Sequence, residues 1–142
     1  MKKLGFGCMR LPLTNPDDPT SVDLEQFCKM IDTFIDNGFT YFDTAYPYHQ
    51  KQGELFVKKA LVERYPRTSF TLADKLPVPF MKVKEDAKRI FDEQLEKCGV
   101  NYFDYYLLHS LNRNHYQAAL KFGCFDFIKK MKEEGKIKEI GF

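Results

Sequence analysis

Three short apolar runs in this chain each lead to an ionisable side chain. The side chains are those of Asp43, Lys75 and His109, which follow the runs 40–42, 70–74 and 105–108. Tyr48 comes five residues after Asp43, in a loop rich in Tyr and Pro. A carboxylate, a phenol, an ammonium and an imidazole are all groups that can move a proton to or from a substrate.

These four groups suit proton donation to a carbonyl oxygen. A free phenol, with a pKa of about 10, holds its proton too tightly to release it readily at neutral pH. A neighbouring ammonium favours the phenolate, and Lys75 could supply it; Asp43 could keep that ammonium charged. His109 could align the substrate oxygen by a hydrogen bond. Tyr46 is the rival to Tyr48, and only the five-residue step from Asp43 favours Tyr48.

The positions of these residues require alternating strands and helices. Apolar residues at three- and four-residue steps, with Gly or Pro at the ends, predict helices over 24–35, 53–61 and 83–98 and helical sequence on both sides of Gly123. Short apolar segments predict strands at 4–11, 39–42, 69–73, 103–108 and 137–142. Five strands and about four helices in alternation predict an α/β fold with a parallel sheet.

The spacing of the candidate residues agrees with this architecture. Lys75 follows Asp43 by 32 residues and His109 follows Lys75 by 34 residues, which is the length of one strand–helix–strand unit. The carboxyl ends of parallel strands lie on one face of such a fold, where its chemistry is usually found. We therefore expect all four side chains to meet there.

Composition narrows the remaining possibilities. The 142 residues are enough for a single domain over 1–142, and a net charge of +2 without a basic stripe argues against nucleic acid as a partner. Four scattered cysteines have no metal-ligand spacing, so we expect reduced thiols and no metal site. No segment has the length and apolarity of a membrane span, and we predict a cytoplasmic protein.

The sequence resembles the aldo/keto reductase family over its whole length. The resemblance rests on Asp43-Thr44-Ala45 with Tyr48, on Lys75, on Leu107-Leu108-His109, and on the flanking segments 4–7, 135–137 and 140–142. It implies a parallel (β/α)8 TIM barrel and an oxidoreductase that transfers hydride from NADPH, or alternatively NADH, to a small aldehyde or ketone. It also implies Tyr48 as general acid/base, Asp43 and Lys75 as its tuning pair, and His109 as the group that orients the substrate.

The predicted elements make up only the front part of such a barrel, which needs eight strands and about 250 residues. The family resemblance implies that most cofactor-binding residues lie beyond Phe142. Open sheet edges would leave backbone groups unpaired, so such a piece is expected to be poorly stable or to self-associate through those edges. We favour the explanation that the chain is a truncated, catalytically incomplete part of a longer protein. The segment 4–12 also resembles bacterial members with an iron-sulfur module after the barrel, and these residues do not test that extension.

Two other hypotheses remain at this stage. Lys75 could instead form a Schiff base in a lyase or aldolase. Alternatively, the chain could be a non-catalytic fragment that only assembles with a partner. Among the other polar residues, we interpret Glu54 as support for a helix N-terminus, Asp74 as facing away from Lys75, and His49 and His115 as loop residues, with His49 able to border a substrate pocket.

Overall fold

A single parallel sheet organises the computed structural model, which describes residues 3–142. Its strands lie in chain order and each pairs in parallel with the next: β1 (Gly5–Gly7), β2 (Tyr41–Asp43), β3 (Thr71–Leu76), β4 (Phe103–Leu108) and β5 (Ile137–Gly141). This is the topology of successive βαβ units. The predicted α/β class and parallel sheet are therefore confirmed.

Helices connect all the strands. The α-helices are α1 (Leu24–Asp36), α2 (Gly53–Val57), α3 (Asp86–Cys98), α4 (Arg113–Lys121) and α5 (Cys124–Glu133). A π-helical turn, η1 (Lys58–Val62), extends α2, and 3-10 turns lie at η2 (Arg67–Ser69) and η3 (Val78–Phe80). There are five α-helices in this part of the chain instead of about four, because Gly123 takes a left-handed conformation, with φ 67°, that separates α4 from α5.

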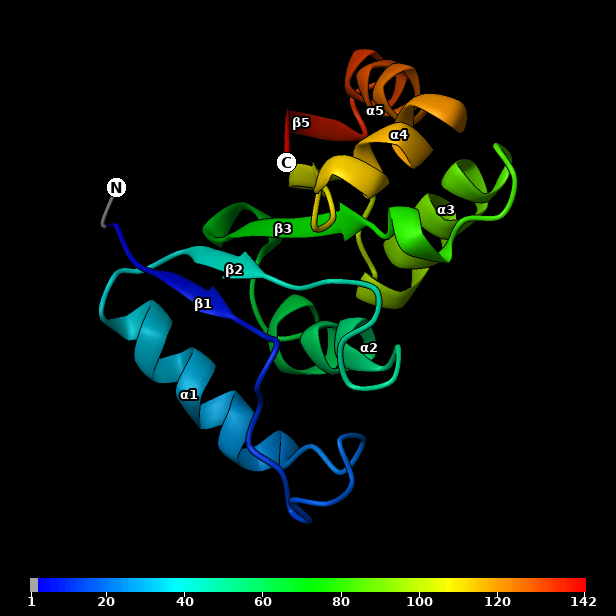
Figure 1. The fold of residues 1–142 in the computed structure, drawn as a ribbon. Coiled ribbons are helices and arrows are strands. Elements are labelled where there is room, and N and C mark those ends of the chain that lie inside the picture. Colours follow the sequence, from blue (N-terminus) through cyan, green and yellow to red (C-terminus); the bar gives the residue numbers. More distant parts are fainter. Residues whose placement is uncertain (1–2) are drawn as a thin grey trace.

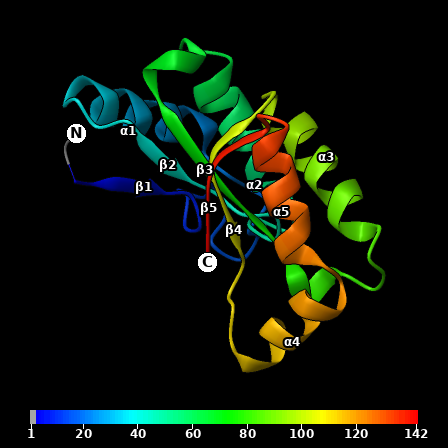
Figure 2. The ribbon, with the colours of Figure 1, turned by 90° about the horizontal axis from the view of Figure 1, so that it is seen from above.

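The helices and the sheet form two layers. Helices α1, α2, α3 and α5 lie along one side of the curved sheet, and no described helix covers its other side (Figures 1 and 2). Helix α4 packs instead against η3, beyond the carboxyl end of β3. Large fully buried side chains fill the space between the layers, among them Phe27, Ile31, Phe42, Leu72, Phe91 and Tyr106.

Local sequence explains where the two long helices begin and end. The Asp23 carboxylate caps α1 by accepting a hydrogen bond from the backbone N–H of Gln26 at 2.9 Å. Helix α3 begins at Asp86 and not at Val83, because the Asp86 carboxylate accepts the backbone N–H groups of Lys82 and Val83. Its last residue is Cys98, and Gly99 follows as the C-cap, with a left-handed φ of 69° that suits a residue without a side chain.

Four strands differ from their predicted ranges, and the differences are largest for β1 and β3. Strand β1 covers only Gly5–Gly7 of the predicted 4–11, because the chain turns after Cys8, whose N–H donates to the Asp43 carbonyl at 2.8 Å. Strand β3 runs to Leu76, beyond the predicted end of its apolar core. Lys75 is therefore the penultimate residue of β3, and its backbone is held by the sheet.

Within residues 3–142, no helix combines the length and apolarity needed to cross a lipid bilayer.

Candidate functional site

The carboxyl ends of β2, β3 and β4 form one rim of the sheet. Asp43 is paired in register with Ala73, and Lys75 is paired with Leu107. The His109 N–H, just past β4, donates to the Leu76 carbonyl at 3.0 Å. The backbone thus brings the three predicted strand-end residues to the same rim.

Lys75 and Asp43 form an ion pair at this rim. Lys75 Nζ lies 2.7 Å from Asp43 Oδ1 and also donates to the Thr44 carbonyl at 2.6 Å. The two side chains are only 13% and 27% exposed, so water screens the pair less than it screens a surface pair. The ammonium is held in one place by two short hydrogen bonds.

Tyr48 and His109 complete the cluster. Lys75 Nζ lies over the Tyr48 ring, 5.3 Å from its centroid. The Tyr48 and His109 rings are nearly perpendicular, with centroids 6.2 Å apart. All four predicted residues are therefore neighbours, although they come from three strand ends and a loop.

Tyr46, the rival tyrosine, lies in a different environment. Its side chain is buried, and its hydroxyl donates to Glu93 Oε2 of α3 at 3.2 Å. Lys97 Nζ, also from α3, lies 4.9 Å from the centre of the ring. Tyr46 therefore packs on the helical layer, and Tyr48 is the tyrosine beside Lys75.

The His109 imidazole is kept in its neutral form by its surroundings. Burial lowers its pKa below the ordinary value, and the charge of Lys75 lowers it further. The nearby Asp43 carboxylate acts in the opposite direction but does not reverse the shift. At neutral pH, a neutral imidazole can donate one hydrogen bond to a substrate oxygen.

The loop after Tyr48 has an unusual backbone. His49, Gln50 and Lys51 have φ values of 50°, 55° and 68°, in the left-handed region that side chains other than glycine rarely adopt. The His49 ring is buried and lies 2.7 Å from the Pro19 carbonyl and 3.2 Å from the Cys8 carbonyl. His49 thus joins the Tyr48 loop to two other loops, a role that its interpretation as a simple loop residue missed.

A second group of polar side chains lies behind the rim, on the helical side of β3. Asp74 faces away from Lys75, as period-two alternation requires, and is fully buried. Glu54 is also fully buried, so it is more than the support of a helix N-terminus that the sequence suggested. Gln94 contacts both acids and was not predicted, although its position four residues from Ile90 and from Cys98 put it in the apolar stripe of α3.

The cysteines are free thiols, and most are buried. Burial, and then the charge of Asp43, raise the pKa of Cys8 to about 12, so this thiol is inert at neutral pH. Among residues 3–142, no three His, Cys, Asp or Glu side chains gather in a way that could hold a metal ion.

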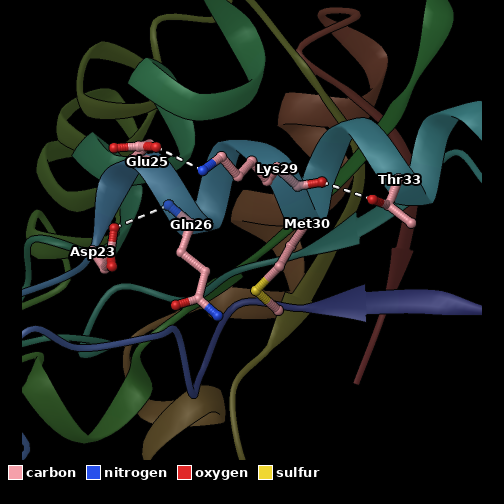
Figure 3. Close-up of a pocket in the computed structure, with 6 residues that line it drawn as sticks. All are labelled: Asp23, Glu25, Gln26, Lys29, Met30 and Thr33. Atoms are coloured by element: carbon pink, nitrogen blue, oxygen red, sulfur yellow. Dashed lines mark hydrogen bonds and ion pairs between the residues drawn. The ribbon is translucent and has the colours of Figure 1, made fainter.

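A pocket along α1 is separate from the rim. It has a volume of about 460 Å³ and is lined by Asp23, Glu25, Gln26, Lys29, Met30 and Thr33 (Figure 3). The charged groups of the pocket already have partners within α1, since Asp23 caps the helix and Lys29 pairs with Glu25 at 2.6 Å. None of the four rim residues lines this pocket, and we assign it no chemistry.

Comparison with known proteins identifies the kind of protein to which this rim belongs. The model of the Aldo/keto reductase family matches residues 3–142. "Probable aldo-keto reductase 1" of Glycine max is 32% identical over 99% of this chain, which spans 41% of that protein. Aldo-keto reductase AKR11C1 from Bacillus halodurans, in its holo form, is 27% identical, with a TM-score of 0.73 over 98% of this chain and 45% of that one.

A further solved structure, an aldo-keto reductase from Klebsiella pneumoniae in complex with NADPH, is 26% identical with a TM-score of 0.72. The alignment covers 96% of this chain and 43% of that protein. The chain thus spans less than half the length of these relatives. The family match and the shared barrel architecture confirm the resemblance found in the sequence, and the chain belongs to the aldo/keto reductase family.

Proposed function

We propose that the protein reduces an aldehyde or ketone to an alcohol, with Tyr48 as the proton donor. The observation that carries the proposal is the position of Lys75, whose ammonium contacts the Tyr48 ring and is held by Asp43 at 2.7 Å. No ordinary core packing requires an ammonium, a carboxylate, a phenol and an imidazole at one rim. Carbonyl reduction uses all four.

In this reaction the Tyr48 hydroxyl gives its proton to the carbonyl oxygen. The nearby Lys75 ammonium stabilises the phenolate that remains, and Asp43, 2.7 Å away, holds the ammonium in place. His109, neutral at physiological pH, donates a hydrogen bond to the same oxygen and aligns it. The hydroxyl is restored when the phenolate takes up a proton from water.

The donor set of the rim fits a nicotinamide cofactor. Its side chains can give a proton and a hydrogen bond, but none of them can give a hydride, so the reaction requires a separate hydride donor. NADPH supplies the hydride to the carbonyl carbon when it is bound. We favour NADPH over NADH because the Klebsiella pneumoniae relative is described in complex with NADPH. The location of most cofactor contacts beyond Phe142 remains a prediction.

Paired tyrosine variants test the assignment of the proton donor. In a form of the protein that turns over a carbonyl substrate, Tyr48→Phe should lower kcat by about 10²- to 10⁴-fold, the usual contribution of a positioned general acid. NADPH affinity, followed by cofactor fluorescence, should stay nearly unchanged. Tyr46→Phe is the matched control and should retain turnover, since its hydroxyl donates to Glu93 of α3, away from the rim. Wild-type turnover in Tyr48→Phe would contradict the proposal.

The Schiff-base alternative has less support. Lys75 is engaged by Asp43 and by the Thr44 carbonyl, and a carboxylate partner favours the protonated amine, which is not nucleophilic. Borohydride treatment in the presence of a carbonyl substrate should therefore leave Lys75 unmodified, as checked by mass spectrometry. A reduced adduct on Lys75 would favour a lyase or aldolase instead.

The remaining proposals concern the molecule as a whole. We propose that residues 1–142 form one domain that corresponds to the front part of the family barrel, and that small carbonyl compounds are its substrates. Self-association through the edges at β1 and β5 is a further proposal. It is supported by the apolar cavity of about 240 Å³ that Leu108, Phe125, Ile128, Ile140, Gly141 and Phe142 line beside β5. A cytoplasmic location stays a prediction.

A further inference from the structure

A buried polar cluster lies directly behind the rim, between β3 and the helices. It consists of Glu54 from α2, Asp74 from β3 and Gln94 from α3, each with no exposed surface. Gln94 Nε2 is 3.1 Å from Glu54 Oε1, 2.9 Å from Asp74 Oδ1 and 3.1 Å from the Lys75 carbonyl oxygen. The Tyr106 hydroxyl donates to Gln94 Oε1 at 2.5 Å, which fixes the orientation of the amide.

The cluster has more acceptors than donors. The two hydrogens of the Gln94 amide serve three oxygens, and Glu54 Oε2 is buried without a hydrogen-bond donor among the described residues. The Lys97 ammonium is 3.7 Å from that oxygen and lies closer, at 2.7 Å, to Glu93. Cys98 Sγ, a weak donor, is 3.8 Å from Asp74 Oδ2. A buried acceptor without a donor is costly, so one more hydrogen is expected here.

A proton held between the two carboxyl groups supplies that hydrogen. Burial raises the pKa of both acids, and the charge of Glu54 raises the pKa of Asp74 further. The hydrogen bond between the carboxyl groups lowers the pKa of Glu54 and raises that of Asp74. The Lys97 ammonium, 3.7 Å from Glu54 Oε2, favours the negative charge on Glu54, which leaves the proton on Asp74.

The same cluster holds the backbone of Lys75. The Lys75 N–H donates to Asp74 Oδ1 at 2.7 Å, and the Lys75 carbonyl accepts from Gln94. The Lys75 side chain leaves the opposite face of β3 and reaches Asp43 and the Thr44 carbonyl. Both hydrogen-bonding groups of the residue are thus fixed from behind, while its ammonium is placed in front.

We propose that Glu54, Asp74 and Gln94 are positioning residues: the two carboxyl groups share one proton, and with the Gln94 amide they hold Lys75, and thereby its ammonium, beside Tyr48. The inference rests on the proposed function in one respect only, namely that a fixed Lys75 ammonium serves Tyr48 in catalysis. The charged and titratable groups around the cluster are Lys97, Cys98, Tyr106 and Cys8, with Glu93 behind Lys97, and the Lys75 ammonium lies on the opposite face of β3.

His109 gives a direct measure of where the Lys75 ammonium lies. Because the charge of Lys75 helps to lower the pKa of His109, displacement of the ammonium should raise that pKa toward the ordinary value of about 6.5. NMR titration of the His109 ring in the 142-residue chain measures this pKa and needs no catalytic turnover. Lys75→Met removes the ammonium completely, so it gives the largest rise in the pKa of His109 that displacement could cause. A failure of the proposed function would therefore leave this measurement intact.

Two substitutions that keep the branched skeleton of the Asp74 side chain separate positioning from simple packing. Asp74→Asn keeps an oxygen for the Lys75 N–H and a donor for Glu54, so the pKa of His109 should match that of the wild type. Asp74→Leu removes both, and the pKa of His109 should rise in the direction seen with Lys75→Met. A wild-type titration in Asp74→Leu, or equal shifts in both variants, would overturn the proposal.

A second measurement applies even if Asp74→Leu does not fold. Infrared spectroscopy of the wild type at neutral pH should show the C=O stretch of one protonated carboxylic acid that resists exchange with solvent. Asp74→Asn should lack this band. Absence of the band in the wild type, or its persistence in Asp74→Asn, would overturn the assignment of the proton to Asp74.

Discussion

Neighbouring residues of β3 point to opposite sides of the sheet and have opposite electrostatic environments. On the rim side, the Lys75 ammonium is paired with the Asp43 carboxylate at 2.7 Å. Asp74, on the other side, is buried against Glu54 and has its pKa raised by burial and by that second acid. The same strand therefore offers a fixed cation to the rim and stores a proton behind it.

The pH dependence of stability should reveal the buried acid. Since the pKa of Asp74 is higher in the folded state than in the unfolded state, the folded state binds more protons above about pH 4, the unfolded value. The contribution of Asp74 to stability is thus fully present below about pH 4 and is lost as pH rises through the folded pKa, by up to about 1.4 kcal/mol per pH unit for one proton. Urea unfolding of the wild type and of Asp74→Asn across pH should give a flatter profile for the variant. Identical profiles would contradict a raised pKa at Asp74.

Between elements, Asp104 joins segments that are far apart in sequence. Its carboxylate accepts hydrogen bonds from Arg67, the first residue of η2, at 2.6 Å, from the Leu72 N–H of β3 at 2.9 Å, and from Lys138 of β5 at 2.8 Å. Burial alone would raise the pKa of Asp104, but the hydrogen bonds from Lys138, Leu72 and Arg67 lower it. This carboxylate ties together the amino ends of three strands, opposite the rim.

Removal of Asp104 should be costly. Asp104→Ala leaves the mostly buried Arg67 guanidinium without its carboxylate partner, and loss of one member of a buried ion pair costs about 3 kcal/mol or more. Chemical denaturation should report the loss. Asp92→Ala is the control, because the exposed Lys88–Asp92 pair should contribute less than about 1 kcal/mol. Equal effects of the two substitutions would exclude a special role for Asp104.

The loop that carries Tyr48 depends on His49. Its ring nitrogens lie against the Pro19 and Cys8 carbonyls, and the left-handed backbone at residues 49–51 is maintained only while the surrounding contacts hold it. His49→Phe preserves the ring contact with Phe56 but loses both polar contacts. Amide hydrogen exchange should accelerate in residues 48–53 and near Pro19, with α3 unchanged. Unchanged exchange in the loop would show that His49 does not hold it.

At the scale of the molecule, the sheet is open within the described residues. Strands β1 and β5 each pair with one neighbour, whereas the relatives are barrels, of which this chain spans less than half. Unpaired strand edges are templates for association. Next to β5, Ile140 is 36% exposed and Phe142 is 86% exposed, which leaves apolar surface in contact with water.

Self-association should therefore depend on the β5 edge. Ile140→Lys places a charge in the cavity beside β5 and should shift the chain toward the monomer in sedimentation velocity experiments at several concentrations. Leu120→Lys is the matched control, since Leu120 is 50% exposed on α4 and lies outside that cavity. If the wild type is monomeric at all concentrations, the proposal of association through this edge is wrong.

The sequence by itself determined the βαβ order, the parallel sheet and the family, because apolar periodicity and the residues that end each strand are local properties. It also identified Asp43, Lys75 and His109 as strand-end residues, since the carboxyl ends of parallel strands share one rim. Only the tertiary structure decided which tyrosine lies beside Lys75, because Tyr46 and Tyr48 occupy the same loop and differ only in the layer that each contacts. Likewise, only packing shows that Glu54, Asp74 and Gln94 converge, since long-range contacts among three elements, and the dry environment that raises the pKa of an acid, have no signature in local sequence.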